Sequence, residues 1–257
     1  DPASHRLLMI ALPTLRAYGM EVPDLARRQG LERRTFCSNT MLWNTNRDQS
    51  AVFQERRISI MLLSGLPLSQ TLYPPGARYS IDADVLVKHS AYGAALDLLA
   101  QTDGFAPRNP DAPHDPSYTN GQEWRKGTAR IDLHARPCHE FARADHLETA
   151  LWARARPIGQ AAAPVPLPHT VLVPAPEDMV LFLAVGQTRV DRMLHGLVDI
   201  FRLITHHKDD FDWALQEKIA RERAASLRLC CVLHYLSSRF DLPVPNVGLE
   251  RHVAGGD

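Results

Sequence analysis

The chain has 257 residues, of which 45% are hydrophobic and 23% charged, a composition typical of a globular protein with a sizeable core. Its 29 basic and 29 acidic residues balance, so no overall positive field attracts the chain to nucleic acid or to an anionic membrane surface. No apolar run approaches the roughly 20 residues of a membrane span, and the opening segment DPASHRLLMIALPTL lacks the basic start of a signal peptide.

The N-terminal part of the chain predicts two helices within residues 4–35. In the first, leucines recur at helical spacing, and Pro13 is expected to break the helix. The second, shorter helix is expected to begin near Pro23 and to end at Gly30. We therefore expect residues 1–50 to form an N-terminal helical segment.

A strand, a short helix, a turn and a second strand are predicted next. The buried strand is ISIMLLSG, residues 58–65, and the helix LPLSQTLY follows it directly. After the turn YPPGARYS, alternating branched apolar residues predict a strand at IDADVLV, residues 81–87. An amphipathic helix follows, and we expect it to end at Gly104.

The middle of the chain predicts a loop, a hairpin and a helix. Residues 106–122 are dense in Pro, Asp and Asn and predict a loop. EWRKGTARIDLHARP, residues 123–137, predicts two strands around a turn at Lys126 and Gly127. Residues 144–158 predict a helix, and residues 159–176 a Pro-rich connector with one short extended piece.

From residue 177 the pattern is helical almost to the end of the chain. Strands are thus expected between about residues 57 and 136, with helices on both sides, which predicts an α+β fold with a small mixed sheet. We expect three domains: an N-terminal helical segment (1–50), a catalytic or binding core (51–145) and a C-terminal helical lobe (146–257).

Two acidic residues, Asp82 and Asp84, point from the same face of the predicted strand at residues 81–87. Their charges repel, the more so when they are partly buried, and a divalent cation removes this repulsion. Oxygen-only ligands suit Mg²⁺. Asp132 follows the same alternation in its own predicted strand and could complete a site of three carboxylates.

An Asp-x-Asp pair by itself is more often a structural feature than a metal site. Here the residues around the pair are those of a core strand, and LLSGLPLS, a glycine-containing strand-to-helix junction, lies a short way upstream. A backbone opening at a helix N-terminus binds anions, and an anion site beside a metal site is what nucleoside triphosphate chemistry needs.

The stretch LLSGLPLSQTLYPPGARYSIDADVLV, residues 62–87, resembles the core of the polymerase-beta-like nucleotidyltransferase superfamily, and within it the bacterial uncharacterised nucleotidyltransferases. That group typically shows a strand ending in Lys-Gly, a helix, the pattern R-x-S-x-D-x-D-x-L-V, and later an acidic residue two positions before a His. The matching positions here are Gly65, Arg78, Ser80, Asp82, Asp84 and the IDLH of residues 131–134. The resemblance extends from about residue 57 to the end and implies a palm-like sheet of the polymerase-beta type.

What the resemblance implies is Mg²⁺-dependent (or Mn²⁺-dependent) phosphoryl transfer with two metal ions. Asp82 and Asp84 would bind the metal carried by the triphosphate, and Asp132 would hold the second metal, which activates the acceptor for attack on the α-phosphorus. The implied nucleotide-binding residues are Ser64, Gly65, Arg78 and Ser80. The family usually has Lys where this chain has Ser64, which puts nucleotide affinity or substrate identity in question.

Three further polar residues are candidates. His134 shares the predicted face of Asp132, either behind the metal ligands or on the acceptor side, and a hydrogen-bonded structural role is equally consistent. Asp199, on a predicted helix, would line the cleft or cap a backbone group. Glu123, on the strand before Asp132, is the next candidate for the third carboxylate.

The leading hypothesis is a nucleotidyltransferase that acts on a small-molecule, peptide or protein acceptor as a tailoring enzyme. One alternative is a glycosyltransferase that uses a sugar nucleotide on the same metal–diphosphate site. Another is a degenerate nucleotidyltransferase fold that serves as a binding partner. The presence of all three acidic residues, Asp82, Asp84 and Asp132, argues against this alternative. We expect no membrane or nucleic-acid partner, and the four scattered cysteines predict reduced thiols and a cytoplasmic location.

Overall fold

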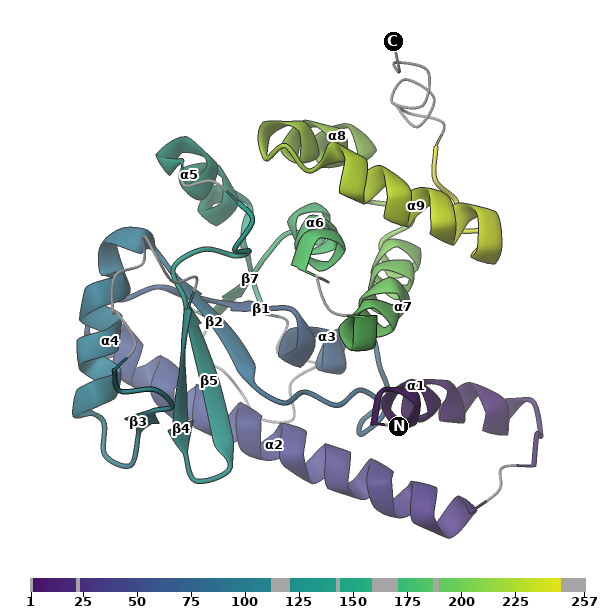
Figure 1. The fold of residues 1–257 in the computed structure, drawn as a ribbon, viewed down its shortest axis with the longest axis horizontal. Coiled ribbons are helices and arrows are strands. Elements are labelled where there is room, and N and C mark those ends of the chain that lie inside the picture. Colours follow the sequence, from purple (N-terminus) through teal and green to yellow (C-terminus); the bar gives the residue numbers. More distant parts are fainter. Residues whose placement is uncertain are drawn as a thin grey trace. The chain divides into compact units, whose positions relative to one another are not determined.

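The computed structural model describes residues 2–21, 24–111, 121–141, 144–158, 171–186 and 190–245 (Figure 1). The chain forms two compact units, the first made of Asp1–His139 and Ala155–Val173, the second of Glu140–Arg154 and Pro174–Asp257. The first unit contains the sheet and the second is helical. The expected division into three domains stays a prediction.

Helix α1 (Pro2–Ala17) does not break at Pro13, so this prediction was wrong. A proline inside a helix removes one backbone hydrogen bond and costs about 3 kcal/mol. The helix nevertheless continues, because packing of an apolar face is the main source of helix stability in a folded protein. Met9 and Leu12 provide that face and are buried.

Helix α2 (Leu25–Glu55) runs through Gly30, where the sequence predicted an end. A glycine in a helix interior costs about 1 kcal/mol relative to alanine. The buried side chains of Trp43 and Phe53, farther along the same helix, contribute more than that. Figure 1 shows α2 running along the sheet of the first unit.

Within the described ranges, seven strands form one mixed sheet in the order β3-β4-β5-β2-β1-β7-β6. Their bounds are β1 Ile60–Leu63, β2 Ala83–Val87, β3 Ala106–Pro107, β4 Gly121–Lys126, β5 Ala129–His134, β6 Arg156–Pro157 and β7 Val171–Val173. Strand β2 lies in the middle, antiparallel to β1 and parallel to β5. The predicted α+β class, with a mixed sheet and helices at both ends of the chain, is confirmed.

The sheet extends beyond the predicted strand region of residues 57–136. Strand β7 pairs in parallel with β1, and β6 pairs with β7. The helix predicted at residues 144–158 therefore ends early: α5 spans Asp145–Arg154, and β6 follows it. The short extended piece expected in the Pro-rich connector is β7, while residues 159–170 of that connector lie outside the described residues.

One face of the sheet carries the core of the first unit. Val85 of β2 and Leu133 of β5 are buried on this face, together with Trp43 of α2 and Leu99 of α4 (Tyr92–Gln101). A short 3-10 turn, η1 (His89–Ala91), precedes α4. Because side chains alternate along a strand, the residues between the core positions of β2 and β5 point to the opposite face.

The second unit consists of α5, α6 (Pro176–Gly186), α7 (Val190–His206), α8 (Trp213–Glu222) and α9 (Ser226–Phe240). Asp178 of α6 is fully buried, and Arg154 donates two hydrogen bonds of 2.8 Å to its carboxylate. Asp212 caps α8, since its side chain accepts a hydrogen bond from the backbone N–H of Leu215. In the part of the chain that the structure describes, no helix combines the length and apolar character needed to cross a membrane.

Candidate active site

Asp84 and Asp132 lie directly opposite each other on the parallel strands β2 and β5. Their strand neighbours Val85 and Leu133 face the core, so the two carboxylates project from the other face of the sheet. The side chains of Asp84 and Asp132 are 26% and 32% exposed, which leaves both half-buried but open to a ligand.

His134 joins these two residues, and we call Asp84, Asp132 and His134 the carboxylate–histidine cluster. Its Nε2 atom lies 3.2 Å from Oδ1 of Asp84 and 3.5 Å from Oδ2 of Asp132. One ligand atom from each residue lies within 4.8 Å of the other two, and no other such group of three occurs among the described residues. Carboxylate oxygens and an imidazole nitrogen are ligands of divalent cations, so the donor set fits a metal ion.

Both carboxylate oxygens of Asp84 are held by neighbours. The hydroxyl of Ser64 donates a hydrogen bond to Oδ2, while Nε2 of His134 lies within hydrogen-bond distance of Oδ1. Groups that hydrogen-bond a metal ligand fix its orientation, and here they come from a turn and from a neighbouring strand. The Asp84 carboxylate is therefore oriented before any ligand arrives.

Ser64 occupies a turn with unusual backbone geometry. Strand β1 ends at Leu63 and helix α3 (Gly65–Thr71) begins at the next residue but one, which confirms the predicted strand-to-helix junction. Ser64 between them has φ 47°, in the left-handed region that a residue with a side chain adopts at a cost of roughly 1–3 kcal/mol. Strain of this kind concentrates at functional sites, and here it places the Ser64 hydroxyl on Asp84.

The environment of His134 changes its titration. Burial acts to lower its pKa, but the hydrogen bond with Asp84 and the charges of Asp132, Asp84 and Asp82 outweigh burial and raise the pKa to about 9. In the metal-free protein the imidazole is thus protonated at neutral pH and offsets part of the negative charge. Asp82, which was predicted inside the strand, lies one residue before β2 and is half-buried.

The predicted nucleotide-binding residues lie together. Arg78 donates hydrogen bonds of 3.3 Å to the carbonyl oxygens of Gly65 and Tyr79. A Cβ atom added at Gly65 would lie 2.9 Å from Nη1 of Arg78 and 3.2 Å from Oγ of Ser80, so only glycine leaves room for this approach. The segment around Arg78 therefore packs against the Ser64–Gly65 turn, although the nucleotide-binding role of these residues stays a prediction.

Gly121 was missed by the sequence analysis, which placed it in a loop. It begins β4 and lies opposite His134. A Cβ atom there would lie 2.7 Å from the carbonyl oxygen of Leu133 and 3.0 Å from both Oδ1 of Asp132 and Nδ1 of His134. The observed turn at Gly127 and Thr128 brings this glycine opposite His134, whereas the predicted turn at Lys126 and Gly127 gives a register in which it does not lie there.

Neither Glu123 nor Asp199 belongs to the carboxylate–histidine cluster. Glu123 lies on β4 opposite Asp132, and its carboxylate binds Arg125 at 2.7 Å and Arg108 at 3.0 Å. Burial raises its pKa, but the hydrogen bonds to these two arginines outweigh burial and lower it. Asp199 is fully buried on α7 in the second unit, and its place in the site stays a prediction.

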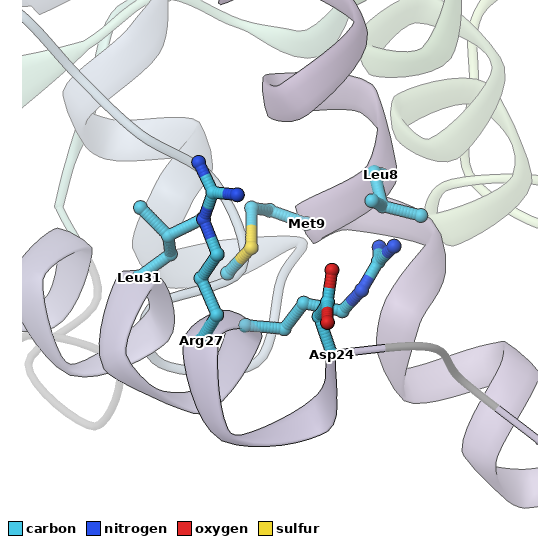
Figure 2. Close-up of a pocket in the computed structure, with 6 residues that line it drawn as sticks. Leu8, Met9, Asp24, Arg27 and Leu31 are labelled. Carbon is cyan, nitrogen blue, oxygen red and sulfur yellow. The ribbon is translucent and has the colours of Figure 1, made fainter.

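A small cavity of about 120 Å³ lies elsewhere in the first unit, where α1 and α2 meet (Figure 2). It is lined by Leu8, Met9, Asp24, Arg27, Arg28 and Leu31. None of these residues belongs to the carboxylate–histidine cluster or to the predicted nucleotide-binding set.

Comparison with known proteins gives one match over almost the whole chain. The family model described as uncharacterised nucleotidyltransferase matches residues 3–241, which include both strands of the cluster. No curated protein matches the chain. Among solved structures, the chain is similar to the solution structure of the antibiotic-resistance factor ANT(2'')-Ia, with 13% identity and a TM-score of 0.33 over 79% of this chain and 91% of that chain.

Proposed function

We propose, since the chain belongs to the uncharacterised nucleotidyltransferase family, that it transfers a nucleoside monophosphate from a nucleoside triphosphate to a small-molecule, peptide or protein acceptor. The predicted family and the predicted enzyme class are confirmed by the match over residues 3–241. The observation that supports the proposed site is the pairing of Asp84 with Asp132 across β2 and β5, with His134 beside both.

The proposed cofactor is Mg²⁺ or Mn²⁺. Asp82 and Asp84 would hold the ion carried by the triphosphate, and Asp132 would hold the second ion of a two-metal mechanism. Oxygen ligands suit Mg²⁺, whereas direct coordination by the His134 nitrogen would favour Mn²⁺. A bound divalent cation supplies charge neutralisation for the triphosphate and for the transition state of in-line displacement.

The residues of the chain have separate tasks in this proposal. An acceptor oxygen forms a bond with the α-phosphorus while the bond from that phosphorus to the bridging oxygen breaks, and pyrophosphate leaves. Ser64 and His134 keep the Asp84 carboxylate in one orientation through both of its oxygens. The Arg78 guanidinium, beside Gly65, would steady the leaving pyrophosphate as a fixed positive charge.

The same proposal covers partners and location. The acceptor and the nucleoside triphosphate are the proposed partners, and neither a membrane nor a nucleic acid is among them. Among the described residues, the cysteines Cys37, Cys138, Cys230 and Cys231 form no disulfide, which supports the proposed cytoplasmic location of a tailoring enzyme.

Isothermal titration with ATP, GTP, CTP, UTP and sugar nucleotides, each in Mg²⁺, in Mn²⁺ and in EDTA, tests the proposal. We expect at least one triphosphate to bind with a divalent cation and to lose at least tenfold in affinity in EDTA, because the paired carboxylates repel an uncompensated triphosphate. Equal affinity in EDTA would contradict the metal-dependent site. Binding of sugar nucleotides alone would favour the glycosyltransferase alternative for the same site.

Two substitutions separate the roles of the carboxylates. Asp84→Asn should lose both nucleotide binding and turnover, whereas Asp132→Asn should keep nucleotide affinity within a few fold and lose turnover, because its interaction matters chiefly in the transition state. Glu123→Gln is the matched control, since Glu123 lies opposite Asp132 but binds two arginines. Normal turnover of Asp132→Asn would show that the third carboxylate lies elsewhere.

A further inference from the structure

Helix α2 contacts the segment that leads into the site, residues 76–80, which we call the 76–80 segment. Its first residue, Gly76, has φ +81°, and a Cβ atom there would lie 2.6 Å from the carbonyl oxygen of Glu32 and 3.4 Å from Cβ of Phe36. Only a glycine permits the segment to approach the helix backbone this closely. The close approach fixes one end of the segment on α2.

Asn39 of α2 fixes the other end. Its Nδ2 donates a hydrogen bond of 2.7 Å to the carbonyl oxygen of Arg78, and its Oδ1 accepts one of 3.1 Å from the backbone N–H of Ser80. The side chain is 4% exposed, so both bonds are shielded from water. The amide thus binds the segment on either side of Tyr79, as a neighbouring strand would.

The three α2 residues involved share one face of the helix. Glu32, Phe36 and Asn39 are separated by four and then three positions, the spacing that brings side chains into line along a helix. Two independent contacts, the close approach at Gly76 and the amide bonds of Asn39, therefore dock the same segment on the same helix face.

The docked segment in turn reaches the predicted nucleotide site. Arg78 places its guanidinium on Gly65, and the Ser80 hydroxyl lies 3.2 Å from where a Gly65 Cβ would be. Gly65 follows Ser64, whose hydroxyl binds Asp84. A continuous set of contacts thus connects Asn39 with the carboxylate–histidine cluster.

We propose that Asn39 is a positioning residue of the nucleotide site: it holds Arg78 and Ser80 against the Ser64–Gly65 turn without touching substrate. The inference rests on the proposed function of these residues. It makes α2 part of the active-site architecture, in addition to its role in the core. An amide suits the task, because one side chain must supply both a donor for a carbonyl oxygen and an acceptor for an N–H.

Asn46 provides a matched control on the same helix. It is 1% exposed, and its Nδ2 donates a hydrogen bond of 2.8 Å to Leu42 of its own helix. Asn39→Leu removes the donor and the acceptor that face the 76–80 segment, whereas Asn46→Leu removes a similarly buried amide whose hydrogen bond lies within α2. Asn39→Asp is a second variant of the same size, which keeps the acceptor for Ser80 and sets a carboxylate oxygen against the Arg78 carbonyl oxygen in place of the amide donor.

The experiment measures two quantities for the wild type and the three variants. The first is the affinity for each nucleotide, ATP, GTP, CTP and UTP, in the presence of Mg²⁺ or Mn²⁺. The second is the rate of hydrogen exchange in peptides that cover the 76–80 segment. We expect Asn39→Leu to speed exchange in the segment and to weaken binding of the preferred triphosphate about tenfold, because the misplaced groups no longer meet the ligand. Asn39→Asp should show the same changes, because its carboxylate repels the Arg78 carbonyl oxygen, and Asn46→Leu should show neither.

Two results would overturn the inference, and they are distinguishable. If the wild type binds a triphosphate and Asn39→Leu alters affinity and exchange no more than Asn46→Leu does, Asn39 is a structural residue and the proposed function stands. If the wild type binds none of the four triphosphates with either Mg²⁺ or Mn²⁺, the proposed function fails and the inference falls with it. Should Asn39→Leu not fold, Asn39→Asp decides by the same two measurements.

Discussion

His134 carries a positive charge between two carboxylates in the metal-free protein, and this charge makes its contribution to stability depend on pH. Its pKa is raised from 6.5 in the unfolded chain to about 9 in the folded state. A group whose pKa rises on folding binds its proton more tightly in the folded state. Its stabilising effect is therefore fully present below pH 6.5 and is lost as the pH rises through about 9.

Denaturant unfolding in EDTA, for the wild type and His134→Gln, measures this effect. We compare the unfolding free energy of the wild type with that of the variant at each pH. We expect this difference to be larger at about pH 6 than at about pH 10, by on the order of 2 kcal/mol in favour of the wild type. A difference between the two proteins that stays constant across this range would mean that His134 does not titrate as its surroundings indicate.

Ser64 combines a strained backbone with a hydrogen bond to Asp84, and two substitutions separate these effects. Ser64→Ala keeps the positive φ and loses the hydrogen bond, so it should lower the unfolding free energy by about 1–2 kcal/mol and weaken metal-dependent nucleotide binding. Ser64→Gly loses the same bond but relieves the strain, so it should be more stable than Ser64→Ala by about 1 kcal/mol. Urea denaturation gives both values, and equal stability of the two variants would refute the strain.

At the scale of elements, the pairing of β4 with β5 brings Gly121 close to the side chains of Asp132 and His134. Gly121→Ala places a Cβ atom against a backbone oxygen, which cannot move away as a flexible side chain can. We expect a loss of about 2 kcal/mol in unfolding free energy and weaker metal-dependent nucleotide binding, because His134, which contacts the Asp84 carboxylate, must shift. Gly93→Ala in α4 is the control, since its Cβ would meet no atom within 4 Å.

Thermal melts and nucleotide titrations of both glycine variants check this prediction. A loss of stability in Gly121→Ala with unchanged nucleotide affinity would show that the alanine is accommodated away from Asp132 and His134. Stability equal to that of Gly93→Ala would show that β4 does not approach β5 as closely as the structure indicates.

The helices and strands that the sequence predicted well are those with a local signal. IDADVLV and ISIMLLSG are short apolar runs bounded by turns, and both contain strands of the sheet. The ends of the N-terminal helices were missed because Pro13 and Gly30 are local signals that tertiary packing overrides. Strand β7 has three residues in a Pro-rich stretch, and only its long-range pairing with β1 makes it a strand.

At the scale of the whole molecule, the site was predictable in its residue types but not in its contacts. Alternation and the family resemblance indicated Asp84, Asp132 and His134, which the sheet brings together. The bond from Ser64 to Asp84 depends on the positive φ of one residue, which the pattern S-G does not encode. The role of Asn39 was not predictable, because the sequence pattern does not show which group a helix amide will bind. Its partner, the Arg78 carbonyl oxygen, is 39 residues away along the chain.

In the proposed function, Asp82 and Asp84 hold the divalent cation carried by the nucleoside triphosphate, and Asp132 holds a second one. Anomalous diffraction from a crystal grown with Mn²⁺ and a non-hydrolysable triphosphate tests it most directly. We predict an anomalous peak at roughly 2.0–2.4 Å from a carboxylate oxygen of Asp84, with triphosphate oxygens on the same ion, and a second peak on the carboxylate of Asp132. A nucleotide bound with its metal away from Asp84 and Asp132 would contradict it.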